Sequence, residues 1–327
     1  MSTFRIEHLI IGESRTIRQL RERVTKLAPS RVPVLIQGPT GAGKELVAEA
    51  LHELSGRTGI LVPVNVSAIA EPMFEDAFFG HVKGAFSDAV RDRSGSLAEA
   101  HRGTLLLDEI GSLARSAQPK LLRAIELGRY RPVGGSTDQY SDFRVVAAAN
   151  EDLERLAEAG QFRFDLLQRL RASLIRVPPL DERREDIPFL VDAFRSRACA
   201  GAVAAPRFSD EAVKWLRERP WPGNVRELKN VVESVLAETH NDVIGPCEIE
   251  SIAPRADRLT PPVSTVGVER RELLDVLDTH GWDIQLVAQS LGIHRVTVWR
   301  WMQRCGIRRP LAGTRSADRV EEASSTR

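Results

Sequence analysis

The sequence predicts an α/β fold with a parallel sheet, followed by a helical subdomain and a small all-α domain. Two observations carry this prediction: short apolar runs alternate with helix-like segments up to about residue 180, and no strand-like run follows. The chain has 327 residues, of which 42% are hydrophobic and 28% are charged. It is therefore long enough for about two domains, with enough apolar side chains to fill their cores.

The first expected element is a helix that begins after Ser14. The apolar residues Ile17, Leu20, Val24 and Leu27 recur at spacings of three and four, which places them on one face of a helix. Serine is a residue type that caps helices, because its hydroxyl accepts from a free main-chain N–H in the first turn. The α/β part should therefore begin with an amphipathic helix.

Five apolar runs predict the strands of the sheet. Each is short enough to be a buried strand. Helix-like segments lie between the runs, for example over 118–127, and this alternation predicts a parallel sheet with its ligands at the carboxyl ends of the strands. The runs are 31–38, 60–67, 103–110, 142–150 and 172–180, the last of which contains two prolines.

The pattern changes after Pro179, and later changes divide the rest of the chain. Helical periodicity is followed by a stretch rich in proline and small polar residues, then by a second helical unit and a polar end without periodicity. The expected parts are an α/β subdomain over 1–180, a helical lid over 181–254, a linker over 255–267, a helical domain over 268–309 and a disordered tail over 310–327.

The composition excludes several classes of protein. A net charge of +1 gives no overall field that attracts nucleic acid, so DNA binding would need a local basic patch. No apolar stretch approaches the roughly 18 residues of a membrane helix, and the amino end, MSTFRIEHLI, lacks the pattern of a signal peptide. The three cysteines lie far apart and form no CxxC pair. We therefore expect a cytoplasmic protein that contacts no membrane.

A glycine-rich segment follows the first predicted strand. Gly38-Pro39-Thr40-Gly41-Ala42-Gly43-Lys44 has the spacing of a phosphate-binding loop, in which main-chain N–H groups surround the phosphates and the lysine reaches the outer ones. A glycine-rich turn before a helix is the alternative, but the strand–loop–helix context favours nucleotide binding. Glu45 replaces the serine or threonine that often helps to hold magnesium, so other residues must contribute to the metal site.

Two carboxylates end the predicted strand that contains Leu105, Leu106 and Leu107. Alone, Asp108 and Glu109 would indicate a strand that meets solvent; together with the phosphate loop, they favour hydrolysis of a nucleoside triphosphate. Asp108 is the expected magnesium residue, directly or through water, and Glu109 the general base for the attacking water. ATP and Mg²⁺ are the expected cofactors, and the seven histidines show no clustering that would indicate another metal.

Helix-like segments near the carboxyl end predict a helix-turn-helix. They span 271–281, 284–292 and 294–306, with a turn at Gly292 between the last two. Five arginines and no acidic residue lie from Ile284 to Pro310, which supplies the local basic patch. A basic helical hairpin for protein contact is the alternative. The predicted DNA contacts are His294, Arg295, Thr297, Arg300 and Arg304.

Several longer segments together resemble one family. GPTGAGKELVAEALH, FFGHVKGAFSDA, GTLLLDEIG, FRFDLLQRL, VPPLDERREDIPFL and WPGNVRELKN occur in the order and spacing typical of bacterial enhancer-binding proteins, the AAA+ activators of sigma-54 RNA polymerase. The resemblance extends from about Leu9 to Arg309. It implies a parallel-sheet AAA+ P-loop ATPase with a helical lid, and a Fis-type helix-turn-helix domain.

The resemblance also implies roles for further residues. Asn65 matches the asparagine that positions the catalytic glutamate, here Glu109. Arg163 and Arg169 match the arginine fingers that reach the nucleotide site of a neighbouring subunit, and Arg226 matches the lid arginine that senses the outer phosphate. For a single arginine, a surface salt bridge is the alternative. A site shared between subunits implies a ring oligomer, which is often a hexamer in this family.

One segment, GAFSDA, matches the family's GAFTGA loop, which moves with the nucleotide state and contacts sigma-54. It has neither helical nor strand periodicity, which predicts a loop with an aromatic tip. An aromatic ring gives a large contact area at a low entropy cost, so Phe86 is the expected contact residue, with a buried ring in an ordinary turn as the alternative. The predicted contact residues are Gly84, Ala85, Phe86, Ser87, Asp88 and Ala89.

These features predict an ATP-hydrolysing, ring-forming activator that binds upstream DNA and remodels the closed complex of sigma-54 RNA polymerase and promoter. About eight residues precede the ATPase core, where family members often carry a sensory or receiver domain. We therefore expect control by a separate regulatory protein, by expression level, or no control.

Two alternatives stay open. Asp88 stands where the family has glycine, which would suit an AAA+ remodeller of another target. Ala149 stands where the family has the threonine of its first sensor, with Asn150 next in the chain. This second departure would suit a DNA-binding regulator with a weakened ATPase.

Overall fold

The computed structural model describes residues 6–199, 205–253, 270–280 and 282–290, together with Val298, Met302 and Ile307. The chain divides into two compact units, residues 1–253 and residues 254–327. The predicted linker over 255–267 and tail over 310–327 lie outside the described residues. Within the described part, no helix is long and apolar enough to cross a membrane.

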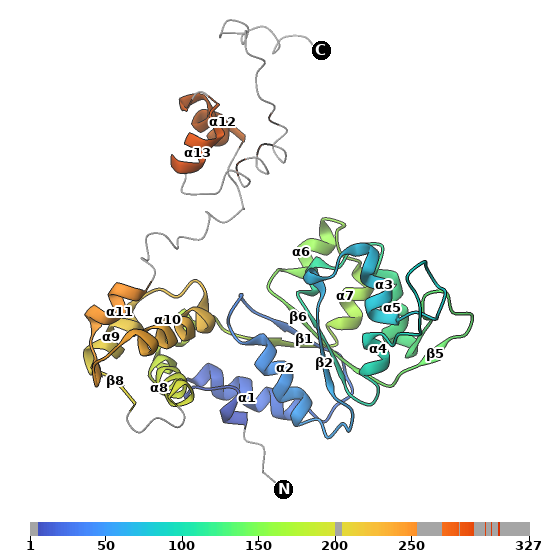
Figure 1. Ribbon diagram of the computed structural model, residues 1–327, viewed down its shortest axis with the longest axis horizontal. Coiled ribbons are helices and arrows are strands. Elements are labelled where there is room, and N and C mark those ends of the chain that lie inside the picture. Colours follow the sequence, from blue (N-terminus) through green and yellow to red (C-terminus); the bar gives the residue numbers. More distant parts are fainter. Residues whose placement is uncertain are drawn as a thin grey trace, which may run out of the picture. The chain divides into compact units, whose positions relative to one another are not determined.

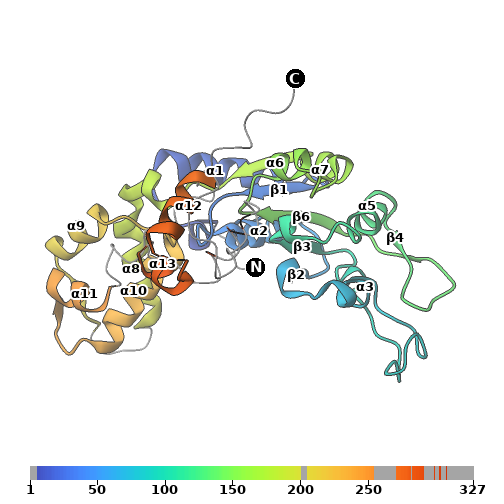
Figure 2. The same ribbon diagram turned by 90° about the horizontal axis from the view of Figure 1, so that it is seen from above.

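A five-stranded parallel sheet forms the centre of the first unit, in the order β2-β3-β6-β1-β7 (Figures 1 and 2). The sequence analysis predicted all five strands. β1 has β6 on one side and β7, an edge strand, on the other. The strands are β1 (Val34–Gln37), β2 (Leu61–Asn65), β3 (Thr104–Asp108), β6 (Arg144–Ala149) and β7 (Ser173–Arg176).

Both faces of the sheet are buried, because successive side chains of each strand point to opposite sides. On β3, Leu105 and Leu107 belong to one apolar core and Leu106 to the other. Helices α1 (Arg15–Leu27) and α2 (Lys44–Glu53) pack on the Leu106 face, and α3 (Phe74–Phe79), α4 (Ser96–Glu99), α5 (Gln118–Leu127) and α7 (Phe164–Leu170) pack on the other (Figure 1).

The amino-terminal helix α1 begins as predicted. The Ser14 hydroxyl accepts a hydrogen bond from the Ile17 N–H at 3.3 Å, and Ile17, Leu20 and Val24 are buried. The sequence analysis missed the short antiparallel pair β4 (Arg129–Tyr130) and β5 (Gln139–Tyr140) after α5. Two-residue strands are too short to show an alternating pattern, which explains the omission. Helix α6 (Leu153–Glu158) then leads to α7.

The lid is helical, with one departure from the prediction. It contains a 3₁₀ segment η5 (Leu180–Asp186) and helices α8 (Ile187–Ala198), α9 (Asp210–Glu218), α10 (Asn224–Glu238) and α11 (Pro246–Ile252). No strand was expected here, but β8 (Arg207–Phe208) and β9 (Val243–Ile244) form a small parallel pair. Trp221, 1% exposed, is among the residues of a separate apolar core that these helices share.

A buried carboxylate joins the lid to the start of α1. Asp186 is fully buried and accepts hydrogen bonds from the Glu13 N–H at 2.6 Å, the Ser14 N–H at 2.7 Å and the Ser14 hydroxyl at 2.6 Å. Gly12 has a φ of +135°, and a Cβ there would overlap the Asp186 carboxyl group. This seam holds the lid against the α/β subdomain.

The second unit contains two described helices, α12 (Arg270–Thr279) and α13 (Ile284–Ser290), at positions where the sequence predicts helices. A small core of Leu273, Leu277, Val287, Val298, Met302 and Ile307 holds the unit together. The predicted DNA contacts His294, Arg295, Thr297, Arg300 and Arg304 lie outside the described residues.

Candidate nucleotide-binding site

The glycine-rich segment forms the turn between β1 and α2, at the carboxyl end of β1. Gly41 has a φ of +76° and Gly43 a φ of +104°, conformations that side chains disfavour, so both positions require glycine. Gly43 caps α2, and a Cβ on Gly41 would overlap the carbonyl oxygen of Gly223 in the lid. The loop therefore leads directly into the N-terminus of α2, and the N-terminus of a helix suits the binding of a phosphate group.

Lys44, the first residue of α2, is 9% exposed. Its Nζ donates to the carbonyl oxygens of Gly38 at 3.0 Å and Pro39 at 3.2 Å, so the ammonium lies folded over the loop. Burial lowers the pKa of Lys44, and the charge of Asp108 opposes that shift more than Glu109 does. The lysine therefore lies within electrostatic range of both predicted carboxylates.

Asp108 is the last residue of β3, and Glu109 follows it directly. Glu109 has a left-handed φ of +53°, and its N–H donates to Asp108 Oδ1 at 3.0 Å. Such strained backbone is common at functional sites, because the surrounding structure must hold it in place. The carboxylates lie at the strand end, and oxygen ligands of this kind suit Mg²⁺. Within the described residues, no cluster of three or more His, Cys, Asp or Glu side chains could hold a further metal.

Asn65 lies beside this pair on the neighbouring strand. It is the register partner of Asp108 in the β2–β3 ladder. Its Oδ1 accepts from the N–H of Ser67 at 3.0 Å and the hydroxyl of Ser67 at 2.8 Å. Asn65 therefore caps the turn that follows β2, and it is the strand neighbour of Asp108, the residue before Glu109.

The lid closes on the loop through Asn224, which the sequence analysis did not single out. This buried residue has a left-handed φ of +54°; its Nδ2 donates to the Thr40 carbonyl at 3.0 Å and its Oδ1 accepts from the Leu180 N–H at 2.8 Å. Beside it, the N–H of Arg226 donates to the Gly41 carbonyl at 3.2 Å. The Arg226 guanidinium is 63% exposed and lies 4.0 Å from Glu45, so it is free to turn toward a bound anion.

A second lid residue, Arg183, also escaped the sequence analysis. It is 4% exposed, and its Nη2 donates to the Ala42 carbonyl at 2.9 Å. Burial lowers the pKa of its guanidinium, while Asp186 acts in the opposite direction. The only sequence signal was its place in the segment VPPLDERREDIPFL, where six consecutive charged residues include both buried ones, Arg183 and Asp186.

An apolar cleft adjoins the loop on the lid side. It encloses about 40 Å³ and is lined by side chains from the chain before α1, from α2 and from the lid, among them Ile10, Ile11, Leu46, Phe194 and Val225. This volume is close to that of one water molecule in the liquid, about 30 Å³.

The predicted first-sensor position is apolar. Ala149 is 1% exposed and packs in the core, while its carbonyl accepts from the Gly38 N–H at 3.2 Å. The next residue provides the polar group: Asn150 Nδ2 donates to Thr40 Oγ1 at 3.4 Å. Asn150 thus links the end of β6 to the phosphate loop.

Arg163 and Arg169 lie on another element. Arg163 is the N-cap residue of α7, and its guanidinium donates to Asp165 from Nε at 3.0 Å and from Nη2 at 2.7 Å. These hydrogen bonds raise the pKa of Arg163 and lower the pKa of Asp165. Arg169 is exposed on α7. The structure therefore does not bring these arginines to the phosphate loop of their own chain through any described contact.

The predicted contact loop lies at the surface, and Phe86 is 42% exposed. Its ring packs edge-on against the His81 imidazole, with centroids 4.8 Å apart. His81 Nδ1 lies 2.5 Å from Asp76 Oδ1, and Arg93 Nη1 donates to Asp76 Oδ2 at 2.7 Å. The buried Asp76 thus fixes the root of the loop while its tip reaches solvent.

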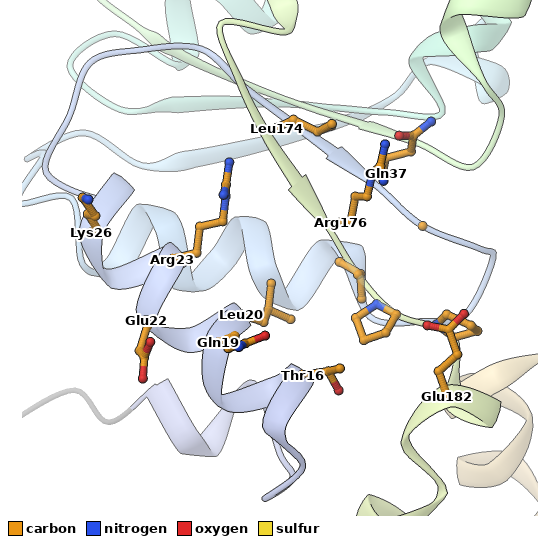
Figure 3. A pocket seen from close by; sticks show the side chains of 14 residues that line it. Thr16, Gln19, Leu20, Glu22, Arg23, Lys26, Gln37, Leu174, Arg176 and Glu182 are labelled. Atoms are coloured by element: carbon orange, nitrogen blue, oxygen red, sulfur yellow. The ribbon is translucent and has the colours of Figure 1, made fainter.

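A much larger cavity lies elsewhere, along the open edge of the sheet between α1 and β7 (Figure 3). It has a volume of about 1130 Å³, and of the predicted phosphate loop only Gly38 lines it. Arg23 of α1 and Arg176 of β7 lie on its walls (Figure 3). The predicted site residues Lys44, Asp108, Glu109 and Arg226 do not line this cavity.

Three family descriptions match the chain in succession. Residues 10–176 match the sigma-54 interaction domain, 181–259 the AAA+ ATPase lid domain, and 267–304 the bacterial regulatory protein, Fis family. The chain belongs to the family of sigma-54-dependent transcriptional activators. The first two matches cover the α/β subdomain and the lid of the first unit.

Two relatives of this activator family share similar identity with the chain. The response regulator protein PilR of Pseudomonas aeruginosa is 38% identical over 88% of this chain and 67% of its own length. The C4-dicarboxylate transport transcriptional regulatory protein DctD of Rhizobium meliloti is 38% identical over 97% of this chain and 67% of its own length. The chain spans about two thirds of each of these relatives.

Another relative and a solved structure extend the comparison. The DNA-binding transcriptional regulator NtrC of Rhizobium meliloti is 42% identical over 72% of this chain, which spans 49% of that activator's length. A crystal structure of NtrX from Brucella abortus in complex with ATP is 31% identical, with a TM-score of 0.67, over 91% of this chain and 69% of that one.

Proposed function

We propose that this chain hydrolyses ATP with Mg²⁺ and uses the reaction to remodel the closed complex of sigma-54 RNA polymerase and promoter. The observation that carries the proposal is the gathering of Lys44, Asp108, Glu109 and Arg226 around one glycine loop that the lid contacts through Asn224. The ATP complex of NtrX, a structural neighbour, supports the choice of nucleotide.

Each residue of the site has a distinct task in this proposal. The N–H groups of the loop and the Lys44 ammonium bind the phosphates, and Asp108 would hold a magnesium ion, whose charge would offset that of the phosphates. Glu109 accepts the proton of the attacking water, with its carboxylate placed by the left-handed backbone and by the neighbouring strand of Asn65. Arg226 reaches the outer phosphate from the lid.

The proposed site is completed by a second copy of the chain. Arg163 and Arg169 supply positive charge to the reacting phosphate, which is the task of an arginine finger. Their position on α7, away from the phosphate loop of the same chain, supports action across a subunit boundary. Assembly as a ring, expected to be a hexamer, would give every site such a neighbour.

The Phe86 loop and the carboxyl-terminal unit bind the partners of the activator in this proposal. The exposed Phe86 contacts sigma-54, and its anchored root transmits movement of the α/β subdomain to that contact. The carboxyl-terminal unit binds upstream DNA through its helix-turn-helix, whose family match supports this role. We further propose that a separate regulatory protein, or the expression level of the chain, controls this activator if it is controlled at all.

Glu109→Gln tests the central step. The amide keeps the size of the side chain but cannot accept the proton, so ATP binding should persist while turnover falls by about 10²–10⁴-fold. Glu126→Gln, on the exposed face of α5, is the matched control and should turn over as the wild type does. Turnover at the wild-type rate in Glu109→Gln would assign the base to another residue.

A further inference from the structure

Helix α7 presents an exposed face that carries a large apolar side chain. Leu166, Leu167 and Leu170 bury the opposite side of the helix, each at most 1% exposed. At 100° per residue, the outward face is then centred on Phe164, Asp165 and Gln168, all exposed. Phe164 is 68% exposed, a high fraction for a ring of this size.

The same face is bordered by positive charge. Arg163 precedes Phe164 and is paired with Asp165, and Arg169 and Arg171 lie on the two flanks of the face, where Arg171 is paired with Glu154. An apolar centre with charged residues around it is the arrangement of a protein interface. Of these three arginines, only Arg169 has no ion pair among the described contacts, so its charge fits a carboxylate on a partner surface.

The nucleotide site of a second copy is such a surface. Its rim carries the carboxylates of Asp108 and Glu109 beside the Lys44 ammonium, while Glu45 is paired with Arg226; bound phosphates would add negative charge there. Leu46, 37% exposed and next to Glu45, adds an apolar side chain on the same rim. The rim therefore offers both the charge and the apolar contact that complement α7.

We propose that Phe164 is the apolar anchor with which one copy of this chain docks on the rim of the nucleotide site of the next copy. The proposal rests on the shared site proposed above and names the residue that holds the two copies together. Phe164 supplies contact area that is removed from water, whereas Arg163 and Arg169 supply charge to the reaction. Loss of the anchor should therefore weaken assembly without slowing the chemistry of assembled copies.

The test measures ATP turnover per chain against protein concentration, with the mass of the particles followed by analytical ultracentrifugation. Phe164→Ala should raise the concentration for half-maximal turnover about tenfold or more, and turnover at saturating concentration should return to the wild-type level. Phe164→Glu should raise it further. Ile60→Ala is the control, because Ile60 is 63% exposed at the opposite, amino-terminal end of the strands.

Three outcomes would overturn the anchor. If Phe164→Ala assembles at the same protein concentrations as the wild type, the aromatic side chain of Phe164 is not in the interface between copies. A turnover defect that persists in fully assembled Phe164→Ala would show that the side chain acts in the reaction itself. An equal assembly defect in Ile60→Ala would show that the loss of any exposed apolar side chain has the same effect. Because Phe164 is exposed, circular dichroism should show an unchanged fold.

Failure of the shared site itself would look different. A wild type whose turnover per chain is independent of concentration, and whose Arg163→Ala variant remains active, would contradict both proposals. A different result would contradict only the anchor: wild-type turnover per chain that depends on protein concentration, impaired turnover in Arg163→Ala, and wild-type assembly and turnover in Phe164→Ala.

Discussion

The phosphate loop and the loop that carries Phe86 belong to the same α/β unit, but they are held in different ways. The phosphate loop is fixed by two left-handed glycines, and main-chain carbonyls of Thr40, Gly41 and Ala42 accept hydrogen bonds from the lid. The Phe86 loop is held at its root, where Asp76 contacts His81, and by main-chain hydrogen bonds within the loop itself, such as that from the Gly84 N–H to the Ala89 carbonyl at 2.8 Å; it has no described contact with the lid.

This difference indicates that ATP hydrolysis depends on the phosphate loop and that contact with a partner depends on the Phe86 loop. A site that binds phosphate gains from donors that are already in place, because no reorganisation is then needed during the reaction. A surface that contacts a partner needs an accessible side chain, and the 42% exposure of Phe86 provides one. Changes in the first region should therefore alter turnover, and changes in the second should alter coupling.

The largest expected effect concerns residues that belong to neither loop. Arg163→Ala and Arg169→Ala should each lower turnover on the order of 10³-fold, because each removes positive charge from the reacting phosphate. In mixtures with Lys44→Ala, whose arginines are intact, part of the activity should return. Mixed assemblies that never exceed the sum of the separate proteins would argue against a site shared between copies.

Within the phosphate loop, Lys44→Ala should lower turnover by about 10²–10³-fold and weaken nucleotide binding, since it removes the buried ammonium that lies over the loop and would bind the phosphates. Equilibrium binding of a fluorescent ATP analogue and phosphate release measure the two effects. Lys214→Ala, in the lid with its side chain 75% exposed, is the control. Unchanged nucleotide affinity in Lys44→Ala would remove the lysine from the binding site.

The seam between the lid and α1 tests the rigidity of the first region. Asp186→Ala leaves two buried N–H groups and a hydroxyl without their acceptor, which should cost about 3 kcal/mol in the free energy of unfolding. Thermal unfolding of residues 1–253 should then shift down by several degrees. Asp192→Ala, which breaks an exposed ion pair in the same lid, should change it by less than about 1 kcal/mol. Equal shifts in the two variants would contradict the role of the seam.

The smallest effect on turnover is expected from ending the chain after Ala253. Residues 1–253 form a compact unit of their own, so ATP turnover should stay within about twofold of the full chain while specific DNA binding is lost. Phosphate release and a gel-shift assay on upstream DNA measure the two properties. A truncated chain that no longer hydrolyses ATP would show that the carboxyl-terminal unit is needed for assembly.

Local patterns in the sequence predicted the parts of the site that depend on local chemistry. The five strands, the α1 cap at Ser14 and the loop around Phe86 follow from periodicity and residue type. Asn224 and Arg183 did not emerge, since their importance comes from contacts with Thr40 and Ala42 far away in the chain. The β4–β5 and β8–β9 pairs were also missed, because two residues carry no period.

The central claim is that ATP turnover and sigma-54 contact are separate properties of two regions, and capture of sigma-54 tests it most directly. Wild type and Phe86→Ala would be incubated with sigma-54, ADP and aluminium fluoride, with ATP turnover measured in parallel. We predict that wild type captures sigma-54, while Phe86→Ala hydrolyses ATP at a comparable rate and captures none. Capture by Phe86→Ala at the wild-type level, or an active wild type that captures no sigma-54, would contradict the account.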